Sequence, residues 1–260
     1  MPVLLSLKYS INGGQRPQGK PAGKGLGESR VDSFGLKRRV ENLGLFMVFS
    51  GLMTKALMFD LDNTLYSEKN GMEFHVLERI NNFVSHFLDL PLAETNAVRR
   101  EGMKRHGTTL EWLVFEKGFK DVDAYFDAVH PYGEEACLKP DAALRKLLES
   151  IHFPKIILTN APMEHAERVL RALDIEDCFS AIYDIKFNAL VGKPHPKAFM
   201  RVLNTCGFSL ATTVFVDDMP KYIRGYLSLG GRAILKDEGD KFADQGFERI
   251  RSLFELPALL

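Results

Sequence analysis

The chain has 260 residues, and its 34 basic and 34 acidic side chains give a formal net charge of zero. This balance gives no reason to expect a nucleic-acid partner, and the sequence has no apolar run of about 18 residues that could form a membrane-spanning helix. Three widely spaced cysteines, Cys137, Cys178 and Cys206, argue against a disulfide-stapled domain and against a zinc site built from cysteine pairs. We therefore expect a cytoplasmic protein that binds neither nucleic-acid polymers nor membranes.

The first 53 residues differ in composition from the rest, with eight basic and three acidic side chains. Residues 11–29 are rich in Gly, Pro, Lys and Gln and lack apolar periodicity, which predicts disorder. Residues 14–20 read G-x-x-x-x-G-K, but Pro21 stands where a phosphate-binding loop needs Ser or Thr. We expect residues 1–53 to be dispensable for chemistry. The sequence leaves open an organelle-targeting segment, a disordered tail or an extension upstream of a natural start at Met53.

From residue 55 onward, short apolar runs alternate with amphipathic helical patterns. The predicted strands are the apolar runs 56–59, 155–158, 213–216 and 232–235. The predicted helices that accompany them are 141–150, 164–173, 196–205 and 221–229. We interpret the pattern of residues 165–170, which begins with His165, as helix packing. This alternation predicts an α/β fold, a Rossmann-like doubly wound parallel sheet with right-handed crossovers.

Residues 66–139 have a different hydrophobic pattern, because no run among them is typical of a strand. Their apolar spacing predicts helices at 73–88, 93–105, 109–117 and 122–129. The simplest interpretation is an all-helical domain inserted after the first strand. We therefore divide the chain into an extension (1–53), an α/β core (54–65 and 140–260) and a helical cap (66–139).

Polar side chains follow three of the predicted strands. They are Asp60 and Asp62 after the first strand, Thr159 and Asn160 after the second, and Asp217 and Asp218 after the third. In open α/β sheets, ligands bind beyond the carboxyl ends of the strands, so we expect these side chains to share one crevice. Four carboxylates there repel one another unless a cation neutralises them, and oxygen ligands favour Mg²⁺. We expect Lys193 to supply positive charge opposite the metal.

Residues 59–66, Phe-Asp-Leu-Asp-Asn-Thr-Leu-Tyr, resemble the first motif of the haloacid dehalogenase superfamily of phosphohydrolases. The other three motifs of the superfamily follow in order: Thr159 after an apolar strand, Lys193 in Gly-Lys-Pro, and the Asp217-Asp218 pair after the third strand. The resemblance covers residues 55–235. It implies a phosphomonoester substrate and a Mg²⁺ cofactor.

The resemblance also implies a role for each matched residue. Asp60 would be the nucleophile that forms an aspartyl-phosphate, and Asp62 would protonate the leaving oxygen and then activate water. Thr159 and the backbone of Asn160 would bind phosphoryl oxygens, and Lys193 would neutralise charge in the transition state. The metal would be held by Asp60, by the backbone carbonyl of Asp62, and by Asp217 and Asp218. Thr64 is expected to stabilise the loop.

Within the superfamily, the helical insert resembles the cap of the first subgroup, and the chain is most similar to pyrimidine 5′-nucleotidases. The similarity rests on Tyr66, on His-Gly-Thr-Thr-Leu at 106–110 and on Leu-Lys-Pro-Asp at 138–141. The family has an aromatic residue at the position of His106. Candidate substrate contacts in the cap are Tyr66, His106, Thr108, Thr109 and Trp112, although packing of Trp112 in the cap core is the stronger interpretation.

Several alternatives stay open at this point. The substrate could be another small phosphomonoester, and a sugar phosphomutase shares every core residue. The alternative that is not an enzyme is a non-catalytic scaffold that keeps the fold and only binds a partner. A haloalkanoate dehalogenase is disfavoured because it needs no acid for its leaving group and therefore no residue such as Asp62. The sequence leaves a monomer and a homodimer equally open.

Overall fold

The computed structural model describes residues 53–260, and the expectations for residues 1–52 lie outside the described part. A single six-stranded sheet forms its centre, with all neighbouring strands parallel and the order β3-β2-β1-β4-β5-β6. The strands are β1 (Ala56–Phe59), β2 (Lys155–Leu158), β3 (Ala181–Tyr183), β4 (Thr213–Asp217), β5 (Arg232–Lys236) and β6 (Glu248–Ile250). This order confirms the predicted doubly wound α/β fold.

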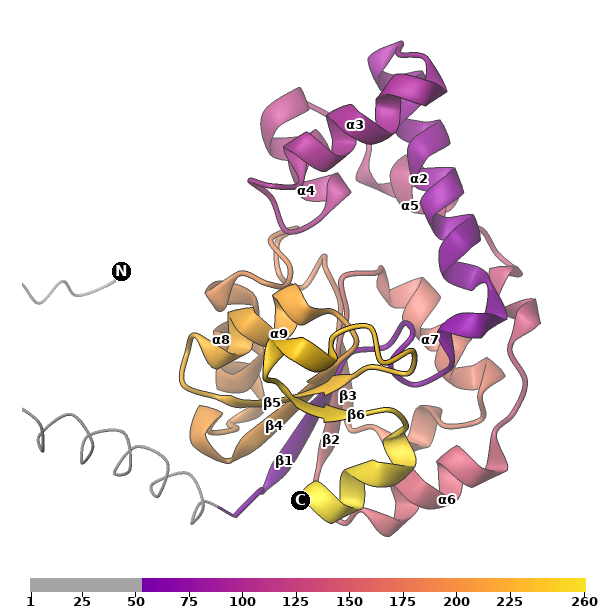
Figure 1. Cartoon of the computed structure of the whole chain (residues 1–260). Coiled ribbons are helices and arrows are strands. Elements are labelled where there is room, and N and C mark those ends of the chain that lie inside the picture. Colours follow the sequence, from indigo (N-terminus) through magenta and orange to yellow (C-terminus); the bar gives the residue numbers. More distant parts are fainter. Residues whose placement is uncertain (1–52) are drawn as a thin grey trace, which may run out of the picture. The chain divides into compact units, whose positions relative to one another are not determined.

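Helices cover both faces of the sheet (Figure 1). The helices are α6 (Ala142–Ser150), α7 (Met163–Ala172), α8 (Pro196–Cys206) and α9 (Pro220–Leu227). Side chains alternate along β1, so that Leu57 and Phe59 pack with α6 and α7 while Met58 packs with α8 and α9. All four residues of β1 are buried, as expected for a central parallel strand covered on both faces.

Four further helices lie between β1 and α6 in the sequence and stand apart from the sheet (Figure 1). They are α2 (Met72–Leu88), α3 (Leu92–Gly102), α4 (Thr109–Lys117) and α5 (Val122–Val129), and we call residues 72–129 the helical insert. The insert has its own apolar core, which includes Val84, Trp112 and Phe126. Gly102 passes directly beside the indole of Trp112, where a Cβ atom would come within 2.4 Å of the ring.

Short 3₁₀ helices complete the described part: η1 (Glu68–Asn70), η2 (Glu134–Cys137), η3 (Glu176–Cys178), η4 (Leu210–Thr212), η5 (Ala243–Gln245) and η6 (Leu253–Leu259). No helix within residues 53–260 combines the length and the apolar character needed to cross a bilayer.

The sequence analysis missed the two edge strands, β3 and β6. Each has only three residues, most of them partly exposed, so neither forms an apolar run long enough to show periodicity. The predicted helix at 221–229 is shorter in the structure, because α9 ends at Leu227 and a turn leads to Gly230, which has a φ of 85°. These differences lie away from the carboxyl ends of β1, β2 and β4.

Candidate active site

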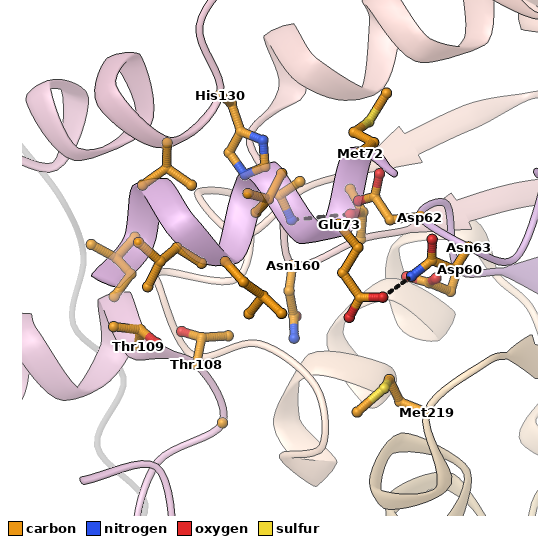
Figure 2. Close-up of a pocket in the computed structure, with 18 of the residues that line it drawn as sticks. Asp60, Asp62, Asn63, Met72, Glu73, Thr108, Thr109, His130, Asn160 and Met219 are labelled. Carbon is orange, nitrogen blue, oxygen red and sulfur yellow. Dashed lines mark hydrogen bonds between the residues drawn. The ribbon is translucent and has the colours of Figure 1, made fainter. Parts of the chain in front are cut away.

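The sheet order reverses at β1, which lies between β2 and β4. Strand β1 leads directly into Asp60, and β4 ends at Asp217, so these two residues meet at the reversal point where open α/β sheets bind ligands. A cavity of about 250 Å³ opens there, between the carboxyl ends of the strands and the helical insert. Its walls include Asp60, Asp62 and Asp218. Figure 2 shows the first two of these side chains.

Lys193 is fully buried beneath this cavity and joins two of the acidic residues. Its Nζ donates hydrogen bonds to Asp60 Oδ1 at 2.5 Å and to Asp217 Oδ2 at 2.6 Å. The second Asp60 oxygen, Oδ2, accepts a hydrogen bond from the Thr64 hydroxyl at 3.0 Å. The position of the Asp60 carboxylate is therefore fixed from two sides, with one oxygen held by a cation and the other by a hydroxyl.

Three carboxylates crowd this point. Burial raises the pKa of Asp60, and burial together with the charges of Asp217 and Asp60 raises the pKa of Asp218 well above its usual range. Burial also raises the pKa of Asp217 to about 7, despite the opposing charge of Lys193. One lysine is therefore too little positive charge to keep all three groups ionised in this low-dielectric environment.

The same three residues fit a divalent metal ion. Each offers a carboxylate oxygen, and these oxygens all lie within 4.8 Å of one another. The Asp217 oxygens accept hydrogen bonds from Lys193 and from the Met219 backbone, whereas no described residue donates a hydrogen bond to the Asp218 carboxylate. An all-oxygen site of this kind suits a hard cation such as Mg²⁺. Asp218 is the residue with the most free ligand capacity.

Thr159 and Asn160 follow β2 and extend this edge of the cavity. The Asn160 side chain is occupied by the Lys193 backbone: its Oδ1 accepts from Lys193 N at 2.8 Å, and its Nδ2 donates to Lys193 O at 3.0 Å. This close approach requires Gly192, where a Cβ atom would lie 2.1 Å from Asn160 Oδ1. The side chain of Asn160 thus holds the segment that carries Lys193.

Asp62 lies in the cavity beside Asp60 but makes different contacts (Figure 2). Its Oδ1 accepts hydrogen bonds from the Tyr66 hydroxyl and from His165 Nε2, both at 2.7 Å. Burial alone would raise the pKa of Asp62, but the charge and hydrogen bond of His165 outweigh burial and lower it. The two carboxylates of the first motif therefore have their pKa values shifted in opposite directions.

His165 is held between two carboxylates. Its Nδ1 lies 2.6 Å from Glu134 Oε1, and its Nε2 lies 2.7 Å from Asp62 Oδ1. Carboxylates only accept hydrogen bonds, so both ring nitrogens must donate and the imidazole carries a positive charge. Burial acts against this charge, but Asp62 and Glu134 together raise the pKa of His165 to about 10.

Glu134, in η2 just after the helical insert, is the partner of several cationic or polar groups. Arg79 forms an ion pair with its Oε2, and His130 Nδ1 lies 3.0 Å from its Oε1. Arg168 of α7 adds a weaker ion pair at 3.6 Å. The His130, Glu134 and His165 side chains lie close enough to surround a metal ion, but their hydrogen bonds and the two arginines already account for the arrangement.

The helical insert forms the opposite wall of the cavity. Thr108 and Thr109 line it, and Figure 2 shows them on the side away from Asp60 and Asn63. The preceding residue, Gly107, holds this loop against the core, because its carbonyl accepts a hydrogen bond from Lys221 Nζ at 2.8 Å. Apolar side chains from the helices fill the space between: Met72, Val76, Leu77, Ile80, Leu110, Phe126 and Val129.

The structure brings most of the predicted site residues together, but not all of them. Tyr66, Thr108 and Thr109 line the cavity, whereas His106 and Trp112 do not. His106 faces Glu116, with Nε2 to Oε2 at 3.2 Å. Trp112 is only 1% exposed within the core of the insert, so its indole has no face free to stack on a ligand.

Two residues beside the predicted set were missed. His165 was interpreted as a packing residue because it opens an amphipathic helical pattern, and Glu134 lies outside every motif. Its position in the sequence could have indicated His165. In this fold, the first turn of a helix that follows a strand lies at the carboxyl edge of the sheet, where ligands bind. His165 lies in that first turn of α7.

Comparisons with known proteins agree with this geometry. Residues 54–225 match the family described as haloacid dehalogenase-like hydrolase. "Phosphate metabolism protein 8" of Saccharomyces cerevisiae is 26% identical over 237 residues, covering 79% of this chain and 72% of that protein. "Glyceraldehyde 3-phosphate phosphatase" of Pyrococcus abyssi is 28% identical over 178 residues, covering 64% of this chain and 74% of that protein.

Solved structures show the same fold. A haloacid dehalogenase-type phosphatase from Thermococcus onnurineus superimposes with a TM-score of 0.56 at 20% identity, covering 79% of this chain and 97% of that one. The L-2-haloacid dehalogenase of Xanthobacter autotrophicus gives a TM-score of 0.51 at 16% identity, covering 80% of this chain and 98% of that one. The architecture is thus compatible with two chemistries, and the site must decide between them. With its four motifs gathered at the reversal of the sheet and the family match over 54–225, the chain belongs to the haloacid dehalogenase-like hydrolases.

Proposed function

We propose that this protein is a magnesium-dependent phosphomonoester hydrolase that works through an aspartyl-phosphate intermediate. The observation that carries the proposal is the pair of carboxylates at Asp60 and Asp62, which line one cavity and have separate hydrogen-bond partners: Lys193 holds Asp60, and protonated His165 holds Asp62. A phosphatase needs both a nucleophile and a separate acid-base group, whereas displacement of a halide needs no proton donor. The glyceraldehyde 3-phosphate phosphatase among the relatives supports this choice.

In the first step, an Asp60 carboxylate oxygen forms a bond to phosphorus as the bond from phosphorus to the leaving oxygen breaks. Asp62 passes a proton from the His165 imidazolium, with which it shares a hydrogen bond, to that oxygen, which leaves as the alcohol. In the second step, Asp62 takes a proton from water and returns it to His165 as the water oxygen attacks phosphorus, which releases inorganic phosphate and restores Asp60. Lys193 and the Thr159–Asn160 segment stabilise the phosphoryl oxygens during both steps.

Asp60, Asp218 and Asp217 are the side chains that would hold Mg²⁺, with the Asp62 backbone carbonyl as a further ligand. Bound Mg²⁺ would supply positive charge to the phosphoryl oxygens and keep the clustered carboxylates ionised. Asp218 would contribute most of the protein's affinity, since its oxygens are not engaged by other described residues.

We infer that residues 66–139 act as a cap over the α/β core formed by 54–65 and 140–260. The apolar residues of the insert that line the cavity would exclude water from the phosphorylated Asp60, and Thr108 and Thr109 would contact the leaving group. The leaving group we favour is a pyrimidine nucleoside, on the strength of the local sequence similarity at Tyr66, 106–110 and 138–141. Another small phosphomonoester is the second candidate, supported by the glyceraldehyde 3-phosphate phosphatase among the relatives.

Metal dependence tests the proposed reaction first. We expect hydrolysis of p-nitrophenyl phosphate to stop on chelation with EDTA and to return with Mg²⁺. Asp218→Asn removes a charged ligand, so it should raise the Mg²⁺ concentration for half-maximal activity by at least about tenfold, equal to ~1.4 kcal/mol of binding free energy. Asp244→Asn, outside the cavity, is the control. No hydrolysis with any divalent metal would contradict the enzyme proposal and favour a scaffold.

Asp60→Asn tests the nucleophile. The change removes the attacking oxygen but preserves side-chain volume, so turnover should fall below a few per cent of wild type while the melting temperature changes little. Rapid acid quench of the wild-type enzyme with substrate should trap a phosphorylated peptide that contains Asp60, identified by mass spectrometry. Exposed Asp123→Asn serves as the control. Retention of substantial turnover, or a phosphorylated peptide elsewhere, would contradict the assignment.

His165→Leu tests whether His165 positions Asp62. We compare kcat/KM, which reports the steps up to phosphoryl transfer, for an alkyl phosphate and for p-nitrophenyl phosphate. The alkyl phosphate should lose about 100-fold because its leaving oxygen needs the proton of Asp62, and p-nitrophenyl phosphate much less. His165→Gln, which can still donate one hydrogen bond, should recover part of the loss, and exposed His152→Leu should change neither substrate. Equal losses for the two substrates would indicate a purely structural role.

A substrate screen tests the nucleotide assignment. We expect kcat/KM for UMP and CMP to exceed that for glyceraldehyde 3-phosphate and for hexose phosphates, with the phosphate appearing as inorganic phosphate in solution. Equal or higher values for the sugar and triose phosphates would overturn the nucleotide assignment while leaving the phosphatase proposal intact. Transfer of phosphate to a second position on a sugar would instead identify a mutase.

A further inference from the structure

Arg99 of α3 is a buried cation that the proposed reaction does not use. It is 8% exposed, and no aspartate or glutamate within residues 53–260 forms an ion pair with it. Burial lowers the pKa of its guanidinium, and no carboxylate offsets that effect. A guanidinium nevertheless stays protonated in proteins, so the insert contains a buried positive charge without an anion.

The hydrogen-bond partners of Arg99 are all uncharged. Its Nε donates to Asn81 Oδ1 at 2.9 Å, while Nη1 reaches Thr109 Oγ1 and Nη2 reaches Asn96 Oδ1, both at 3.3 Å. The remaining contact is to the thioether of Met103, which is a weak acceptor. A guanidinium carries five N–H donors, so these contacts fix its orientation without satisfying its charge.

Arg99 lines the same cavity as Asp60, Asp62 and Asp218. Its contact with Thr109 places it on the side of the cavity away from Asp60, where Figure 2 shows Thr109. Tyr125, which also lines the cavity, lies near enough for the charge of Arg99 to oppose the effect of burial on its pKa. The cavity therefore runs from an acidic, metal-binding end, past apolar walls, to a cationic end.

We propose that Arg99, with Thr109 beside it, is a binding site for a second anionic group on the substrate, located on the alcohol that leaves. The proposal rests on the phosphatase function proposed above. Within the substrates of that function, pyrimidine nucleotides included, it favours those whose leaving alcohol carries an additional acid, such as a carboxylate. A guanidinium binds a carboxylate through two parallel hydrogen bonds, and the low dielectric of a buried site strengthens them.

Two matched substrate pairs test the proposal, and they differ in the distance between the phosphate and the carboxylate. Each pair differs by one carboxylate: 3-phosphoglycerate against glycerol 3-phosphate, and orotidine 5′-monophosphate against UMP. In the wild-type enzyme with Mg²⁺, the acidic member of at least one pair should have the higher kcat/KM, by about 10- to 100-fold. A ratio of one or less in both pairs would overturn the proposal, whatever the variants do.

Arg99→Gln should remove this preference mainly through KM, while Arg99→Lys should keep part of it. Arg100→Gln, which changes an exposed arginine on the same helix, should leave the ratios unchanged. Hydrolysis of p-nitrophenyl phosphate, which has no second acid, separates the two proposals. Its absence in the wild type would refute the phosphatase function, whereas its presence with a ratio unaffected by Arg99→Gln would refute only the role of Arg99.

Discussion

Four carboxylates surround the point where the sheet order reverses, and the arrangement of the site depends on how their charge is balanced. Lys193 neutralises part of it by bridging Asp60 and Asp217 from below. His165 neutralises another part by donating to Asp62. Asp218 is left without a donor among the described residues and faces the cavity. The remaining imbalance is what a divalent cation is suited to correct, and the open side is where it would enter.

The same charge balance gives two adjacent carboxylates different properties. Asp60 is crowded by other acids, so its ionised form depends on Lys193 and on added positive charge. Asp62 accepts hydrogen bonds from His165 and Tyr66, and the charge of His165 lowers its pKa despite burial. Environment alone thus gives two carboxyl groups only two residues apart in the sequence opposite pKa shifts.

The core strands, the helical insert and the residues of the four motifs could all be predicted from the sequence, because each depends on local patterns. Strand β1 is an apolar run that ends in Asp60, and its burial follows directly from that pattern. The proposed roles of His165 and Arg99 could not be predicted this way. The role proposed for His165 depends on its contact with Glu134, 31 residues away, and the role proposed for Arg99 depends on its burial, and only the packed structure reveals either. Trp112 lies in the core of the insert, which was the stronger of its two interpretations, whereas His106, in the loop before α4, faces Glu116.

The chain passes between core and insert twice, and Asp62 is tied to both passages. Tyr66, on the outgoing passage, donates to Asp62 directly, and Glu134, on the returning passage, reaches it through His165. If the insert rotated as a rigid body, the rotation axis would lie near the two segments that connect it to the core. Atoms close to a rotation axis move least, so Asp62 would hardly be displaced. The acid-base group would then keep its alignment in every position of the insert, while the threonines at the far wall would travel furthest. Movement of the insert to admit substrate would then leave the hydrogen bond between Asp62 and His165 undisturbed.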